Sequence, residues 1–192
     1  MAKEEKKKSG LWILIAVVAV IVMWFIGTYN GLVTMNESID GNWAQVENNL
    51  QRRYDLIPNL VSTVKGYAKH EEEVFTAVSD ARAKLAGGNL SVAETAAATN
   101  EMNSALSRLL AISEAYPELK ANENFMSLQD ELAGTENRLA VSRKDYNDSV
   151  KTFNAKIKTI PTNIVAGIMG STAREYFEIT EAAAQNVEVN FE

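Results

Sequence analysis

A run of apolar residues near the N-terminus constrains this sequence more than any other feature. From Leu11 to Ile26 there are 16 residues, and their only polar side-chain groups are the indole N–H groups of Trp12 and Trp24. Taken as residues 10–28, the run would form a helix about 28 Å long, close to the roughly 30 Å hydrocarbon core of a bilayer. Tryptophan near both ends is typical of a helix that meets two membrane interfaces. The run therefore predicts a single transmembrane helix whose partner is the lipid bilayer.

A cleaved signal peptide is the competing interpretation of the same run. Cleavage needs small residues at the third and first positions before the cut, and the residues after the run, Gly27, Thr28, Tyr29 and Asn30, do not supply a good pair. The chain also has no Cys that could carry a lipid anchor. We therefore expect the helix to remain uncleaved.

The charges on either side of the run predict its orientation. Residues 1–9 hold four Lys and two Glu, whereas no basic residue follows the run until Arg52. Because basic flanks stay in the cytoplasm, residues 1–9 are expected to form a cytoplasmic tail and the rest to lie outside. A net charge of −6 for the whole chain leaves −8 after the tail. That acidic balance disfavours nucleic acid as a partner, and it disfavours attraction of the ectodomain to anionic lipid.

The composition removes most catalytic chemistry. Without Cys there is no disulfide, thiolate metal site or cysteine nucleophile, and one His, His70, excludes any site with two imidazoles. The sequence His70-Glu71-Glu72-Glu73 lacks a second His, since Val74 stands where a zinc-protease helix would need it. We see no nucleophile elbow and no phosphate loop. The sequence therefore predicts no enzyme, no cofactor and no metal.

Helical periodicity dominates the remainder of the chain. Positions spaced alternately three and four residues apart run without a slip from Tyr29 to Leu85, which is the heptad pattern of a bundle or coiled-coil helix. The pattern keeps the phase of the apolar run, so one continuous or gently kinked helix is expected to leave the membrane. These positions, called the first seam below, are Tyr29, Leu32, Asn36, Ile39, Trp43, Val46, Leu50, Arg53, Ile57, Leu60, Val64, Tyr67, Glu71, Val74, Val78, Ala81 and Leu85.

Two places complicate the first seam. Pro58 lacks an amide N–H, and a kink is expected there. The stretch from Gly66 to His70 is either a turn, which gives four helices, or part of one helix reaching Ala86, which gives three. The unbroken spacing slightly favours the single helix, whereas a charged Glu71 on the seam favours the turn.

Helix boundaries are marked more clearly further along. Gly87 and Gly88 are expected to end a helix, because glycine supplies the positive φ needed there. Ser91 and Glu94 have the spacing of a capping box for the next helix, which should stop before Pro117.

A last long helix is expected at about 123–159, with Asn122 as its N-cap and Pro161 after its end. Its positions at the same spacing form a second seam, which includes polar residues: Leu128, Leu132, Thr135, Leu139, Ser142, Tyr146, Ser149 and Phe153. The helical ectodomain is thus placed at 29–160 and a C-terminal segment, apolar and then acidic, at 161–192. Within that segment a short edge strand is predicted from the alternation of Val187, Val189 and Phe191.

Charged residues on or beside the seams are the least expected feature. Arg53 occupies a first-seam position, while Glu136 and Arg143 flank the second seam. A lone buried charge costs several kcal/mol, so Arg53 should pair with a carboxylate, either Glu136 or Glu114. Such polar layers either fix the register of the helices or form a pocket that recognises a ligand or partner.

Several longer motifs resemble the LemA family. They are Tyr29-Asn30-Gly31-Leu32-Val33, Trp43 with Val46, LQRRYDLIPNLV at 50–61, SEAYPELKAN at 113–122, LQxELxxTENR at 128–138, RxxYNxxVxxFN at 143–154, Ile160-Pro161, and Tyr176-Phe177. The resemblance covers nearly the whole chain from about residue 11. It implies a bacterial all-α protein with one N-terminal membrane helix and an antiparallel bundle of three to four long helices outside the cytoplasm. It implies no established catalytic activity and no cofactor.

These observations together predict a membrane-anchored helical scaffold that acts through protein–protein contacts. We expect a single-pass homo-oligomer in the bacterial cytoplasmic (inner) membrane, N-terminus inside, with other envelope membrane proteins as further partners. The alternative is a ligand-sensing ectodomain that uses the polar layer around Arg53 and Glu136. Expected contact surfaces are the Tyr116-Pro117 corner and the apolar stretch 164–169. The residues singled out as structural or interaction candidates are Arg53, Asp55, Pro58, Glu114, Tyr116, Pro117, Glu136, Arg143, Tyr146 and Asn147.

Overall fold

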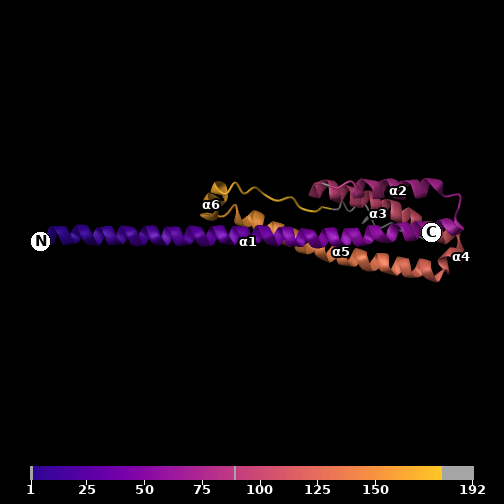
Figure 1. The fold of residues 1–192 in the computed structure, drawn as a ribbon, viewed down its shortest axis with the longest axis horizontal. Helices are drawn as coiled ribbons and strands as arrows, with labels where there is room; N and C mark the ends of the chain where they lie inside the picture. The colour runs from indigo at the N-terminus through magenta and orange to yellow at the C-terminus, as the bar shows by residue number, and fades with distance from the viewer. Residues whose placement is uncertain (1, 89, 179–192) are drawn as a thin grey trace, which may run out of the picture. The chain divides into compact units, whose positions relative to one another are not determined.

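The computed structural model describes residues 2–88 and 90–178, with side chains described from Gly10 onward. Every regular element in these residues is an α-helix, so the predicted all-α class is confirmed (Figure 1). The predicted strand at Val187, Val189 and Phe191 lies outside the described residues. The helices are α1 (Ala2–Tyr67), α2 (Glu72–Ala86), α3 (Val92–Ala115), α4 (Pro117–Lys120), α5 (Glu123–Lys156) and α6 (Thr162–Ile168).

The chain forms two compact units, and α1 and α5 contribute to both. The first, called the membrane unit because it contains the apolar run, comprises Met1–Gly41 and Asp148–Arg174. The second, the bundle unit, comprises Asn42–Asn147 and Glu175–Glu192.

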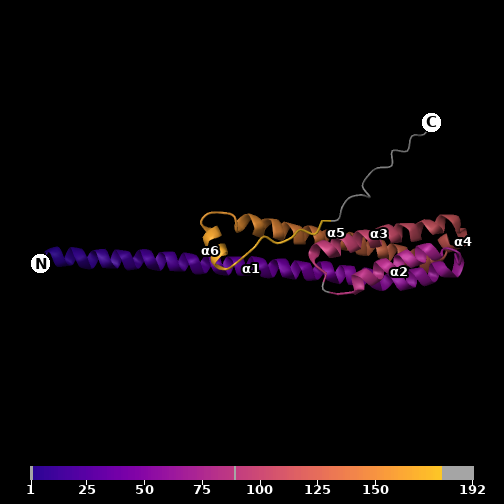
Figure 2. The same cartoon turned by 90° about the horizontal axis from the view of Figure 1, so that it is seen from above.

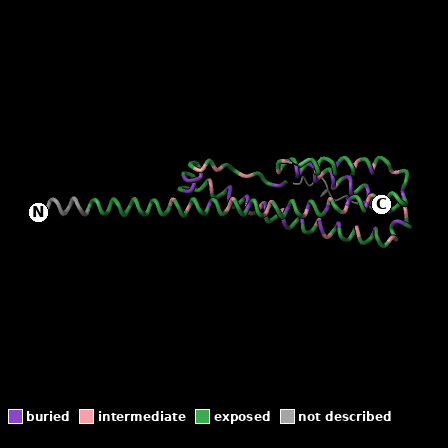
Figure 3. The backbone as a smooth tube through the Cα atoms, viewed as in Figure 1, coloured by how far each residue is buried: buried purple, intermediate pink, exposed green. Residues whose placement is uncertain are grey.

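The bundle unit is an antiparallel arrangement of four helical segments. Residues 42–67 of α1, then α2, α3 and residues 123–147 of α5 run in alternating directions, and α4 makes the corner between α3 and α5 (Figures 1 and 2). Buried residues recur along each segment at helical spacing, as expected when each helix turns one apolar stripe to the core (Figure 3). The main core residues are Ile57, Leu60, Val64, Phe75, Val78, Ala81, Met102, Leu106, Leu109, Leu119, Phe125 and Leu132.

The first seam does not belong to one helix, so the slightly favoured interpretation of a rod reaching Ala86 is wrong. The helix α1 ends at Tyr67 and α2 begins at Glu72. In a continuous rod, Val78 and Ala81 of the first seam and the nearby Phe75 would lie beyond the rest of the bundle. Folding back buries Phe75 in the same core as Leu60 and Val64, and that burial outweighs the hydrogen bonds lost at the turn. Pro58 remains inside α1 on its exposed side.

The predicted helix ends are largely confirmed. Ser91 caps α3: its hydroxyl accepts the Glu94 N–H, and the Glu94 carboxylate accepts the Ser91 N–H at 2.8 Å. Hydrogen bonds from Ser91 lower the pKa of Glu94. Asn122 caps α5 by accepting the Phe125 N–H at 3.0 Å. Gly88 has φ of 65°, as required of a residue that ends α2. The helix α5 ends at Lys156, three residues before the expected end.

In the membrane unit, α1 has two stretches of opposite character. The large apolar side chains from Leu11 to Ile26 are exposed, except that of Phe25, which is half-buried (Figure 3). Further along α1, Leu32 and Ile39 are buried, as are Phe153 of α5 and Val165 of α6. Among the described helices α1 alone is long and apolar enough to cross a membrane. An exposed apolar surface of this length is what a bilayer would cover.

Candidate functional site: a buried polar layer and an anchored C-terminal segment

Arg53 is the centre of a polar layer inside the bundle unit. Its seam position turns the side chain inward from α1, where Nη1 lies 2.5 Å from Glu136 Oε2 of α5 and donates to Asn103 Oδ1 of α3 at 2.6 Å. The Arg53 side chain is 7% exposed, whereas that of Glu136 is 43% exposed. The layer thus connects three helices and places an inner cation against a carboxylate that water still reaches.

The polar layer is incompletely satisfied. Among the described residues, Arg53 Nε and the Tyr54 hydroxyl have no hydrogen-bond partner of good geometry, and Glu136 Oε2 contacts Arg53 as an ion pair. An unsatisfied buried polar group costs about 1–3 kcal/mol, so this layer does not maximise stability.

Burial dominates the electrostatics of the polar layer. It lowers the pKa of the Arg53 guanidinium, and the Glu136 carboxylate offsets only part of that effect. Burial also raises the pKa of the Tyr54 phenol, against smaller opposing effects from Thr99 and Arg53. The Tyr54 hydroxyl therefore stays protonated at neutral pH as a hydrogen-bond donor.

Tyr54 also lines an open groove of about 520 Å³ on the bundle unit. Leu85 and Leu90 supply apolar lining, while Gln51 and Thr95 supply polar groups. This combination of size and mixed lining is typical of small-molecule sites, although the groove is open rather than enclosed.

Of the two carboxylates predicted as partners of Arg53, Glu136 is the one that pairs with it. Glu114 is exposed and instead forms an ion pair with Lys120 at 2.8 Å. Asp55 is exposed and accepts a hydrogen bond from Gln51 at 2.9 Å. These two candidates lie on the surface, outside the layer.

The remaining candidates near corners and seams have simpler surroundings. The Tyr116 hydroxyl donates to Glu71 Oε1 at 3.4 Å, and exposed Pro117 begins α4. Arg143 is half-buried and lies beside the second seam. Pro58 contributes only an exposed position on α1.

Tyr146 and Asn147 hold the C-terminal segment onto the bundle unit. Asn147 Nδ2 donates to the Phe177 carbonyl at 3.1 Å, and the Phe177 N–H donates to Asn147 Oδ1 at 2.9 Å. The Tyr146 hydroxyl donates to the Glu175 carbonyl at 2.8 Å. The fully buried Phe177 ring lies 5.6 Å from that of Trp43, which is also 5.1 Å from that of Tyr146.

The membrane unit repeats this pairing with a second asparagine. Asn154 Nδ2 donates to the Arg174 carbonyl at 2.9 Å and Asn154 Oδ1 accepts the Arg174 N–H at 2.8 Å. The Arg174 guanidinium then pairs with Asp40 and donates to Asn36 Oδ1 of α1. In each pairing one side-chain amide bonds both the N–H and the carbonyl of a single backbone residue. These are the hydrogen bonds that a neighbouring strand would otherwise supply.

Several residues of these sites were missed by sequence reasoning. Asn103 follows the apolar Met102 on α3, and nothing local distinguishes it from a solvated amide. Phe177 was noted only as part of a family motif, because its segment has no periodicity that would predict burial. A usable signal did exist on α5, where Asn147 and Asn154 are seven residues apart and therefore share a helix face.

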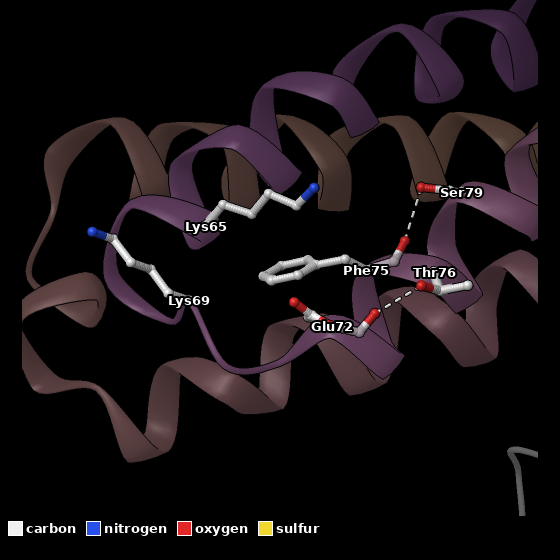
Figure 4. A pocket seen from close by; sticks show the side chains of 6 residues that line it. All are labelled: Lys65, Lys69, Glu72, Phe75, Thr76 and Ser79. Atoms are coloured by element: carbon white, nitrogen blue, oxygen red, sulfur yellow. Dashed lines mark hydrogen bonds between the residues drawn. The ribbon is translucent and has the colours of Figure 1, made fainter.

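Another hollow, of about 510 Å³, lies where α1 turns into α2 and is lined by Lys65, Lys69, Glu72, Phe75, Thr76 and Ser79 (Figure 4). Three of its polar side chains are already engaged: Lys65 Nζ lies 5.0 Å from the centre of the Phe75 ring, and the hydroxyls of Thr76 and Ser79 donate to carbonyls of their own helix. We assign it no ligand. No group of acidic or imidazole side chains suited to a metal occurs in the part of the chain that the structure describes.

Comparison with known proteins gives consistent matches. The model of the LemA family matches residues 42–191. Magnetosome protein MamQ 2 of Paramagnetospirillum magneticum is 29% identical over 194 residues, which cover 86% of this chain and 71% of the relative. Magnetosome protein MamQ of Magnetospirillum gryphiswaldense is 28% identical over 209 residues, with coverages of 92% and 77%. Protein LemA of Metamycoplasma hominis is 23% identical over 152 residues, with coverages of 79% and 69%.

Proposed function

Since the chain belongs to the LemA family, we propose that it is a membrane-anchored helical scaffold that acts through protein–protein contacts as a homo-oligomer. The observation that carries this proposal is helix α1, whose exposed apolar run is followed along the same helix by seam residues that build a bundle. Such a helix connects a membrane anchor to the bundle unit, and the surface of the bundle unit is then available for protein contacts.

The proposed location is the cytoplasmic membrane of a bacterium, with the N-terminus inside and the helical units outside. The support is the charge asymmetry around the run, with four Lys in the tail and no basic residue after it until Arg52. The proposed partners are copies of the same chain and other membrane proteins of the envelope.

The oligomer proposal makes a direct prediction about mass. The full chain has a mass of 21.1 kDa, so light scattering of protein in a detergent micelle should give a protein mass that is a multiple of this value. Cross-linking in membranes before solubilisation, which excludes dissociation by detergent, should give the same multiple. A protein mass of one chain in both measurements would contradict the oligomer.

A second candidate function, ligand sensing, is favoured by the polar atoms left unpaired around Arg53 and by the groove that Tyr54 lines. In this proposal a small polar molecule supplies the missing hydrogen bonds, and its binding stabilises the bundle unit.

The variant Tyr54→Phe tests whether the polar layer binds a ligand or serves the fold alone. Removing an unpaired hydroxyl should raise the free energy of unfolding by up to about 1 kcal/mol or leave it unchanged. Thermal unfolding in the presence of a metabolite panel should reveal a stabilising compound for the native chain and a smaller shift for Tyr54→Phe. Equal shifts for the two chains, or no shift with any compound, would count against sensing at this layer.

A further inference from the structure

The short helix α6 of the membrane unit presents an apolar face to solvent. Ile160, Ile164 and Ile168 are 84%, 60% and 69% exposed. The last two lie one turn apart on α6 and therefore share a face, while Val165 and Ala166 on the same helix are buried. A solvent-facing helix normally carries polar residues on its outer face, so these three isoleucines require a covering surface.

The position of this apolar face relative to α1 identifies what could cover it. Lys156, the last residue of α5, lines the same hollow as Trp24 and Thr28 of α1. Met169, which follows α6, lines a second hollow with Leu32 and Val33 of α1. Both views of the fold also place α6 beside α1 (Figures 1 and 2). Residues 157–161, which connect α5 to α6, and α6 itself therefore lie close to the end of the apolar run. A bilayer that surrounds the run would have its surface there.

The charges of this part of the chain fit the same surface. Although the chain has 25 acidic residues, positions 149–174 contain none, while they contain four basic residues. Lys156 and Lys158 shortly precede Ile160 and are exposed, so their long side chains are free to extend toward phosphate groups. Although the ectodomain as a whole is acidic, residues 149–174 are therefore locally basic and suited to bind lipid headgroups.

We infer that residues 156–168 form a second membrane contact, in which Ile160, Ile164 and Ile168 insert at the boundary of headgroups and acyl chains and Lys156 and Lys158 bind lipid phosphates. This inference rests on the proposed anchoring of the run at 10–28 in a bilayer. It assigns lipid, rather than another protein, to the apolar stretch at 164–169. The membrane unit would then contact the membrane through two elements that are far apart in sequence.

The absence of native Cys permits a test by single labels on the full chain. Four variants, Leu14→Cys, Ile160→Cys, Ile164→Cys and Val141→Cys, would carry an environment-sensitive fluorophore in vesicles of phosphatidylethanolamine and phosphatidylglycerol. All four native side chains are exposed, so the substitutions should not disturb folding, and circular dichroism would verify helicity. Lipids with a nitroxide near the headgroup or near the chain end report depth, and aqueous iodide reports water.

The inference predicts that labels at 160 and 164 are quenched most by the nitroxide near the headgroup, as expected for insertion of about 5–10 Å. The label at 14 should be quenched most by the deeper nitroxide, and the label at 141, on α5 of the bundle unit, by iodide alone. If 160 and 164 behave like 141, the second contact is overturned while the anchor stands. If 14 is not quenched by lipid, the anchor itself fails. Protection of 160 and 164 from iodide without lipid quenching would show a protein covering this face and would overturn the inference.

Discussion

The variant Glu136→Ala is expected to lower the free energy of unfolding by about 2–3 kcal/mol, because it leaves the Arg53 guanidinium buried without its carboxylate. Removing one partner of a fully buried pair costs about 3–5 kcal/mol, and the expectation is smaller here because Glu136 is itself partly solvated. Asn103 would remain as the only acceptor for Arg53 Nη1 among the described residues. Urea unfolding followed by circular dichroism measures the loss.

Two further variants measure the interaction free energy between Arg53 and Glu136. Arg53→Met keeps the packing of the aliphatic stem and removes the charge, so its loss should be below about 1 kcal/mol. The double variant should unfold close to Arg53→Met alone, because the cost of Glu136→Ala exists only while Arg53 is charged. Glu131→Ala is the matched control, since its ion pair with Arg52 is exposed at 3.4 Å and should contribute at most about 0.5 kcal/mol. Strictly additive losses at 53 and 136 would contradict the pairing.

The heptad spacing predicted the buried stripes of the long helices well. Leu32, Val46 and Leu60 of the first seam are all buried, because any helix in a bundle must turn one stripe inward whatever its neighbours are. The same argument correctly buried Arg53. It could not choose between Glu114 and Glu136, because that choice depends on which helix lies beside α1 and at what height.

The turn after Tyr67 shows a limit of the spacing argument. Spacing of three and four residues indicates which residues are buried. The spacing can continue unbroken where the chain reverses, because both helices can face the same core with their apolar stripes. Gly66 and Glu71 were the local signals that favoured a turn, and the structure has the turn, between Tyr67 and Glu72. The anchored residues 174–177 were beyond prediction for another reason: their backbone bonds go to side chains of α5, and neither helical nor strand periodicity marks such a segment.

The variant Phe177→Ala is expected to have the largest effect of all, a loss of about 3–5 kcal/mol in the free energy of unfolding of the bundle unit. The Phe177 ring is fully buried, and its truncation leaves a cavity beside the rings of Trp43 and Tyr146, which helices α1 and α5 hold in place. Because whole domains are stable by only about 5–15 kcal/mol, this one residue outside any helix would supply a large share of the total.

The contribution of Phe177 can be separated from that of its backbone anchor. Asn147→Asp keeps the oxygen that accepts the Phe177 N–H but loses the donor to the Phe177 carbonyl, so it should cost about 1–3 kcal/mol. Tyr176→Ala is the matched control, because that ring is partly exposed and should cost less than about 1 kcal/mol. All three would be compared by urea unfolding of the full chain. If Phe177→Ala unfolded like Tyr176→Ala, residues 175–178 would be an appendage. The contacts instead predict that Phe177→Ala costs more than Asn147→Asp, and Asn147→Asp more than Tyr176→Ala. Residues 175–178 would then be a structural part of the bundle unit, because Phe177 packs between α1 and α5 without belonging to either helix.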